Sequence, residues 1–274
     1  MHDLKDNFDK ILPIVKLTLA DQLNSNNNLQ FYPNKPKLTD ACIISFALLQ
    51  EALGIDSERW FWSKLKTDYN QAFNLPDLSR YNRRRKRLAH WTHQLARLWS
   101  KALSPGEDTF IVDSIPVPVA HIAREHATKV CRENFDTAPD KGYSAVLSQF
   151  YIGYKLHLLV SLNGVYQRME LTKASVHDSQ YLKNIKTSGI KDSLLLADRG
   201  YLSEYHQIDL FYNCGIELQT PMRSNQKGFR RWPKTFKNAR KRIEVVFAQL
   251  CDQMMLKRNY AKPSIVCVLE SYVK

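Results

Sequence analysis

Apolar residues in the first hundred positions recur three or four residues apart, the spacing that puts them on one face of a helix. Residues 4–23 carry such a stripe, interrupted by Pro13 as a break or restart. Residues 40–53 are apolar almost all round, and Thr39 before them can cap a helix. The first part of the chain is therefore predicted to be helical.

The pattern changes after Ser104-Pro105-Gly106, a turn-forming triplet. Residues 150–160 alternate between more and less apolar side chains, the period of a strand, and residues 165–171 do so again. Asn163-Gly164 stands between these runs, and this dipeptide is a strong hairpin signal. We predict a domain border at residues 105 and 106.

Two short apolar runs each end in an acid. Residues 110–112 lead into Asp113, and residues 194–197 lead into Asp198. Each run is typical of a buried strand that presents a carboxylate at its exposed end. A third acid, Glu244, falls in a strongly helical segment that begins near residue 238.

The predicted order after residue 105 is strand, hairpin of two strands, helix, strand, helix, strand, helix. That order is the one of the ribonuclease H-like α/β fold, with a mixed five-stranded sheet flanked by helices. We predict an all-α, basic, DNA-binding region over residues 1–105 and a ribonuclease H-like catalytic domain over residues 106–274.

The charge composition indicates a polyanionic partner. The 274 residues include 40 Lys and Arg against 27 Asp and Glu, a formal net charge of +13. Such an excess favours nucleic acid, because cations displace phosphate counterions. We find no signal peptide and no apolar run of the roughly 18 residues that a membrane span needs. A soluble, cytoplasmic protein without a membrane partner is expected.

Two stretches concentrate the positive charge. Residues 80–87 hold six cations in eight positions, and residues 223–242 interleave nine cations with three aromatic residues. Cations beside aromatic rings suit a DNA end and stacking on an unpaired base, although a solvated helix face or loop would show the same pattern. The candidate DNA-binding residues are Arg80, Arg83, Arg84, Arg85, Arg87, Arg199, Arg230, Arg231, Trp232 and Arg240.

Three carboxylates suit phosphodiester cleavage by metal ions. Two divalent ions about 3.5–4 Å apart, bridged by a carboxylate, can activate the attacking oxygen and stabilise the transition state. Mg²⁺ prefers oxygen ligands and keeps several waters, so three carboxylates are enough for two ions of Mg²⁺ or Mn²⁺. We assign Asp113 as the bridging ligand, with Asp198 and Glu244 each holding one ion.

Other roles for acids at these positions remain open. Strand-end acids commonly cap turns, and surface helices are rich in Glu. Glu244 is nevertheless flanked by apolar residues, with Arg240 one turn before it, so an ion pair or a metal is expected to hold it. Asp178 competes for the second position, but it begins a predicted helix, where capping or indirect support of the metal is the favoured role.

These residues resemble the DDE transposases of bacterial insertion sequences, most closely the insertion-sequence 982 family. The motifs that carry the resemblance are Val112-Asp113-Ser114-Ile115-Pro116-Val117, Gly153-Tyr154-Lys155-Leu156-His157-Leu158, Ala197-Asp198-Arg199-Gly200-Tyr201, and Arg240 with Ile243-Glu244. The resemblance implies that Asp113, Asp198 and Glu244 are the metal-binding triad. It also implies that Arg240 contacts DNA near the cleaved phosphate and that the helical region binds the terminal repeats.

The implied activity is Mg²⁺-dependent hydrolysis at each transposon end, followed by attack of the freed 3′-hydroxyl on target DNA. The implied partners are double-stranded DNA, as terminal inverted repeats and as target, and a second copy in a homodimer on DNA. Lys237 and Cys251 stand where related enzymes carry a Tyr and a Lys. The alternatives are a truncated, inactive DNA-binding remnant and a ribonuclease H-like nuclease without strand transfer.

Overall fold

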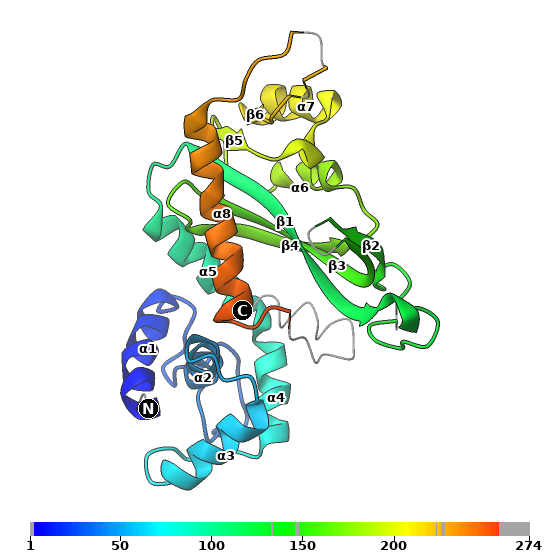
Figure 1. Cartoon of the computed structure of the whole chain (residues 1–274). Coiled ribbons are helices and arrows are strands. Elements are labelled where there is room, and N and C mark those ends of the chain that lie inside the picture. The colour runs from blue at the N-terminus through cyan, green and yellow to red at the C-terminus, as the bar shows by residue number, and fades with distance from the viewer. Residues whose placement is uncertain (1–2, 133, 146–147, 223, 226–227, 258–274) are drawn as a thin grey trace. The chain divides into compact units, whose positions relative to one another are not determined.

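The computed structural model describes residues 3–132, 134–145, 148–222, 224–225 and 228–257 (Figure 1). The chain forms two compact units. Of the described residues, unit 1 contains residues 3–98 and 253–255, and unit 2 contains residues 99–252 and 256–257. The domain border that the sequence predicts at residues 105 and 106 stays a prediction. No described helix is both long and apolar enough to cross a membrane.

Unit 1 is helical. Its helices are α1 (Leu4–Thr18), α2 (Asp40–Ala52), α3 (Glu58–Asp68), α4 (Leu78–Arg87) and the first part of α5 (Ala89–Leu103). The hydroxyl of Thr39 accepts a hydrogen bond from the Cys42 N–H and caps α2, as predicted. Pro13, by contrast, lies inside α1 and does not interrupt it. The sequence pattern did not indicate α3.

Unit 2 contains a six-stranded sheet. Its strands are β1 (Thr109–His121), β2 (Asp140–Ser144), β3 (Gln149–Ser161), β4 (Tyr166–Lys173), β5 (Leu194–Leu196) and β6 (Glu217–Gln219). Long β3 pairs antiparallel with β1, and it also pairs antiparallel with β2 through residues 149–153 and with β4 through residues 154–160. β5 lies parallel to β1, and β6 lies parallel to β5.

Without β2, the strand order is β4-β3-β1-β5-β6, in which an antiparallel meander is followed by two parallel strands. This is the ribonuclease H-like topology, so the predicted fold class is confirmed. The predicted count of five strands was one short. β2 was missed because its sequence, Asp-Lys-Gly-Tyr-Ser, has no apolar alternation, and the sequence pattern indicated a loop with a short helix there.

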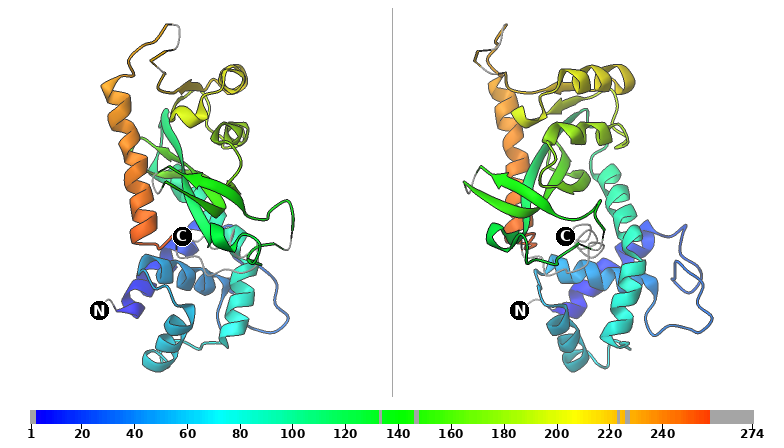
Figure 2. Two further views of the ribbon diagram at one scale, coloured as in Figure 1. Left: turned by 45° about the vertical axis from the view of Figure 1, so that its right-hand side comes forward. Right: turned by 90° about the vertical axis from the view of Figure 1, so that its right-hand side faces the viewer.

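Helices cover both faces of this sheet (Figure 2). One face carries the short helices η2 (Asp178–Tyr181) and α6 (Leu182–Ile185), together with α7 (Glu204–Cys214). These pack on Phe110, Val112, Leu195 and Ala197. The other face carries α8 (Lys234–Asp252), whose Ile243 and Phe247 pack on Ile111 and Leu196. Successive residues of β1 and β5 therefore point to opposite helical layers.

The turns around these elements follow sequence signals. Asn163-Gly164 joins β3 to β4 as predicted, with Gly164 at a φ of 84°. Ser203 caps α7, and Gly215 closes it in the left-handed conformation. Short η1 (Ile122–Arg124) follows β1, and η3 (Arg199–Tyr201) follows Asp198.

Candidate active site

Strand register brings Asp113 and Asp198 to the same edge of the sheet. Ile111 of β1 pairs with Leu196 of β5 in the parallel ladder. Asp113 stands two residues beyond Ile111, and Asp198 stands two residues beyond Leu196. Because side chains alternate, both acids point to the same face as Ile111 and Leu196, which is the face covered by α8.

The sequence pattern suggested that Asp113 ends its strand, but it does not. β1 continues to His121, paired throughout with β3. The element that ends here is β5, so Asp113 lies where the parallel ladder stops. The carboxylate therefore lies at the end of the parallel ladder although its own strand runs on.

The Asp113 carboxylate has two partners and is largely buried, with 15% of the side chain exposed. Its Oδ1 accepts a hydrogen bond from the Ser114 N–H at 2.8 Å, and its Oδ2 accepts one from Nη2 of Arg240 at 3.0 Å. Burial, together with a smaller contribution from the nearby Asp198 charge, raises the pKa of Asp113 to about 6 against the lowering by Arg240 and the Ser114 N–H. The carboxylate thus titrates close to neutral pH.

Asp198 is fixed by the turn that it begins. It is the N-cap of η3, and its Oδ1 accepts a hydrogen bond from the Gly200 N–H at 2.8 Å. Tyr201, two residues on from Arg199, is fully buried and contacts His157 through its hydroxyl at 3.0 Å. The Asp-Arg-Gly-Tyr motif is therefore a compact turn that holds its acid in place.

Glu244 is presented differently from the two aspartates. It lies on α8 one turn after Arg240, and its side chain is exposed. The expected ion pair between Arg240 and Glu244 is wrong, because Arg240 pairs with Asp113, and the alternative that a metal ion holds Glu244 stays a prediction. Among the described residues, no three His, Cys, Asp or Glu side chains gather closely enough to hold a metal ion. Membership of Glu244 in a metal-binding triad stays a prediction.

Asp178 lies beside the segments that carry Asp113 and Asp198, and its expected role in indirect support of the metal stays a prediction. The N-cap of η2 is His177, and Asp178 is the first residue of that helix. Oδ1 of Asp178 accepts hydrogen bonds from Oγ of Ser114 at 3.2 Å and from Nζ of Lys155 at 2.9 Å. Sequence reasoning assigned no role to Lys155. The available signal was two polar residues, Lys155 and His157, at alternate positions of an otherwise apolar strand.

The donor set of Asp113 and Asp198 fits a divalent cation such as Mg²⁺. Both groups offer carboxylate oxygens, and Mg²⁺ in phosphoryl-transfer sites is commonly held by one or two carboxylates with the substrate phosphate and water. Two like charges near each other also favour a cation, because the Asp198 charge raises the pKa of Asp113.

Two of the candidate DNA-binding residues on α4 are half-buried and pair with acids from other helices of unit 1. Arg84 forms an ion pair with the fully buried Asp40, donates to the Leu38 carbonyl at 2.6 Å, and lies over the Tyr32 ring at 4.7 Å. Arg85 pairs with Glu58 at 3.2 Å. The exposed cations of this helix are Arg80, Arg83, Lys86 and Arg87. The candidates Arg80, Arg83 and Arg87 are therefore accessible to a partner, and their contact with DNA stays a prediction.

The cations near α8 are mostly exposed. Arg199, Arg230 and Arg231 are open to solvent, whereas Arg223 and Lys227 lie outside the described residues. Trp232 is half-buried and packs edge to face on Phe236, with 6.0 Å between ring centroids. Trp232 thus contributes to the core beneath α8, and its predicted stacking on a DNA base stays a prediction.

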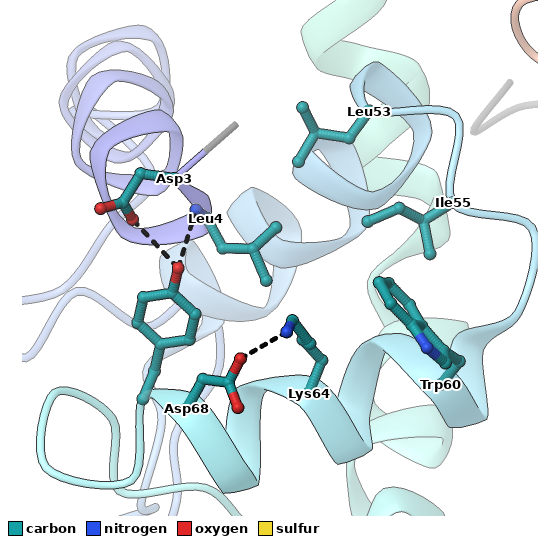
Figure 3. A pocket seen from close by; sticks show the side chains of 8 residues that line it. Asp3, Leu4, Leu53, Ile55, Trp60, Lys64 and Asp68 are labelled. Atoms are coloured by element: carbon teal, nitrogen blue, oxygen red, sulfur yellow. Dashed lines mark hydrogen bonds and ion pairs between the residues drawn. The ribbon is translucent and has the colours of Figure 1, made fainter. Parts of the chain in front are cut away.

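A pocket of about 430 Å³ lies in unit 1 (Figure 3). Tyr69 at its wall accepts a hydrogen bond from the Leu4 N–H and donates one to Asp3, and Lys64 pairs with Asp68 at 2.5 Å. None of the candidate site residues lines this pocket.

The fold and the site define a ribonuclease H-like domain with paired aspartates at the end of its parallel ladder. Residues 105–261 match the family described as Transposase DDE domain. The match covers more than half of the 274 residues, so the chain belongs to this DDE transposase family. No curated protein matches the chain.

Among solved structures, the "Mos1 transposase paired-end complex with left transposon end" is similar to this chain. The sequences are 12% identical, the alignment covers 89% of this chain and 79% of that chain, and the TM-score is 0.27. Because this score is low, the fold assignment rests on the strand order and register of unit 2.

Proposed function

We propose that this protein is a metal-dependent transposase that hydrolyses a phosphodiester at each transposon end and then joins the freed 3′-hydroxyl to target DNA. The observation that carries this proposal is the convergence of Asp113 and Asp198 where β5 ends. Membership of the DDE transposase family supports the same chemistry. The motifs around these acids favour the insertion-sequence 982 family as the narrower group.

Asp113 and Asp198 would hold Mg²⁺ or Mn²⁺. When bound, such ions activate an attacking oxygen and neutralise charge on the phosphate. With its pKa near 6, Asp113 is mostly ionised at neutral pH and is ready to coordinate a cation. The partner of Asp113, Arg240, would then be released to donate to a phosphate oxygen, a contact for which a guanidinium is well suited.

Glu244 is the proposed third acid. It stands one turn from Arg240 on the helix that covers the face to which Asp113 and Asp198 point. Catalytic contacts are commonly looser without substrate and tighten when it binds. We propose that Glu244 would hold a second ion in the complex with DNA.

Double-stranded DNA is the proposed partner, as terminal inverted repeat and as target. The exposed arginines of α4 would contact phosphates from unit 1, and Arg199, Arg230 and Arg231 would do so from unit 2. Two transposon ends must be joined in one complex, so a homodimer on DNA is proposed.

One observation favours a second candidate function, a DNA-binding remnant without activity. In the described part of the chain, Glu244 does not join the two aspartates to form a three-ligand group. A chain that had lost catalysis would keep the basic surfaces and bind ends without cutting them.

The test is an assay with a labelled duplex that carries the element's own terminal repeat, with and without Mg²⁺. Cutting in Mg²⁺, together with joining of pre-cut ends to a plasmid, is the expected result. Cutting without joining would identify a nuclease instead. Binding without cutting would identify the remnant.

A further inference from the structure

Asp178 connects three segments of the candidate site. It begins η2, which lies on the face of the sheet opposite to α8. Its Oδ1 accepts from Ser114, the residue after Asp113, and from Lys155 of β3. Its Oδ2 faces the turn that carries Asp198, because a Cβ atom built on Gly200 would lie 3.0 Å from this oxygen. One carboxylate thus links β1, β3 and the Asp198 turn.

The close approach of Asp178 explains why position 200 is a glycine. Its φ lies outside the left-handed region, so the backbone there is open to any residue. The Cβ of another residue would come within 3.0 Å of Oδ2 of Asp178 and also of Oδ1 of Asp198. Glycine therefore allows two carboxylates to flank the same short stretch of backbone.

The last residue of η2 also supports the turn that follows Asp198, through His157. Tyr181, its last residue, stacks on His157 with ring centroids 4.6 Å apart. His157 contacts the Tyr201 hydroxyl through Nδ1 and the Thr172 hydroxyl through Nε2. η2 therefore supports the turn between Asp198 and Tyr201 from both of its ends.

Side-chain alternation separates Asp178 from Asp113, one of the two proposed metal ligands on the sheet. Asp113 shares the face of Ile111, toward α8, whereas Ser114 shares the face of Val112, toward η2. Both hydrogen bonds to Asp178 come from this second face, from Ser114 and from Lys155. The ammonium of Lys155 also balances the charge that Asp178 adds near two other acids.

We propose that Asp178 is a positioning residue, which sets the separation of the Asp113 and Asp198 carboxylates from behind the sheet without binding the metal itself. The inference rests on the proposed function, since it concerns the same metal site. Groups that orient metal ligands typically contribute about 10-fold to 100-fold in metal affinity.

The test compares Asp178→Asn with Asp178→Ala. Asparagine keeps an oxygen that can accept from Ser114 and Lys155, whereas alanine removes it. The affinity of the full chain for Mn²⁺ is measured by electron paramagnetic resonance. It should fall about 10-fold to 100-fold in Asp178→Ala and stay close to the unmodified value in Asp178→Asn. The Mg²⁺ concentration for half-maximal cleavage should rise in the same order.

Asp209→Ala is the matched control. It removes another aspartate paired with a lysine, Lys186, in unit 2 and away from the paired acids, and Mn²⁺ binding should not change. Gly200→Ala supplies a second probe if Asp178→Ala fails to fold, because its methyl group would push on both carboxylates. It should weaken Mn²⁺ binding as well.

Three results would overturn the inference. Equal losses in Asp178→Asn and Asp178→Ala, as large as in Asp198→Asn, would make Asp178 a ligand. Unchanged Mn²⁺ binding in Asp178→Ala and Gly200→Ala would remove its role. Since Mn²⁺ binding is measured without DNA, a protein that binds Mn²⁺ but never cuts would contradict the proposed function while still testing Asp178. No Mn²⁺ binding by the unmodified chain would overturn both.

Discussion

The two aspartates on the sheet and the glutamate on α8 are held in different ways. Asp113 and Asp198 are placed by strand register, and each accepts a backbone N–H within two residues of itself. Glu244 projects from an exposed helix surface. A carboxylate that accepts a hydrogen bond from a neighbouring backbone N–H is restricted in its rotamers, whereas an exposed glutamate on a helix surface keeps most of its rotamer freedom. The two aspartates are thus already positioned in this structure, and the recruitment of Glu244 to them stays a proposal.

Unit 1 shows the same contrast among cations. Arg84 and Arg85 are held by Asp40 and Glu58, whereas Arg83 and Arg87 on the same helix are exposed. A count of cations in the sequence therefore overstates the number available to DNA. Substitution of the paired arginines should reduce stability, and substitution of the exposed arginines should reduce DNA binding.

The largest expected effect concerns Glu244. If this residue closes onto the sheet acids when DNA binds, Glu244→Gln will reduce Mg²⁺-dependent cleavage below detection, as will Asp113→Asn. Binding of the terminal repeat, measured by gel shift, should be nearly unchanged in both. Cutting at a normal rate by Glu244→Gln would remove the helix from the metal site and leave only the two aspartates.

Arg84→Ala should be the most destabilising of the arginine substitutions on α4. It leaves the fully buried Asp40 without its ionic partner, which typically costs about 3–5 kcal/mol. Arg83→Ala, on the exposed side, should change the free energy of unfolding by no more than about 0.5 kcal/mol. Urea denaturation of both variants measures the difference, and equal values would show that the Arg84 pair is not a structural one.

Asp113→Asn should stabilise the metal-free protein at neutral pH. The folded pKa is about 6 and the ordinary value is 3.8, so the folded state keeps its proton to higher pH. Ionisation of the buried Asp113 therefore lowers the free energy of unfolding as pH rises from about 4 to about 6. At pH 7 this loss reaches about 3 kcal/mol.

The asparagine variant lacks this pH dependence, so its advantage should appear at pH 7 and vanish near pH 4. Thermal or urea unfolding at both pH values, in the presence of a chelator, measures it. A variant that is less stable than the unmodified protein at pH 7 would show that the ion pair with Arg240 outweighs the burial of Asp113.

The smallest effect is expected for substitution of the exposed cations of α4, measured as a change in the salt dependence of DNA binding. Arg83→Gln and Arg87→Gln should each reduce the slope of log affinity against log salt concentration by about 0.9, the value for one lost phosphate contact. Lys86→Gln offers a comparison at a neighbouring exposed position. If the slope does not change in any of these variants, this side of α4 does not face DNA.

Sequence patterns predicted the hairpin at Asn163-Gly164, the cap of α2, and the strands that lead to Asp113 and Asp198. These features depend on local periodicity and on turn residues, which a sequence displays directly. β2 lacks any alternation, so only its pairing with β3 reveals it. Side-chain pairing was equally hidden. Spacing placed Arg240 beside Glu244, but tertiary packing pairs it with Asp113.

The most direct test of a metal held by the paired aspartates is cleavage by Asp198→Cys in Mg²⁺ and in Mn²⁺. A thiolate is a poor ligand for Mg²⁺, which prefers oxygen, and a better one for a transition metal. The unmodified protein should cut the terminal-repeat duplex with either ion, and the cysteine variant should cut only with Mn²⁺. Cutting by Asp198→Cys in Mg²⁺ at the unmodified rate would contradict the assignment of Asp198 as a metal ligand.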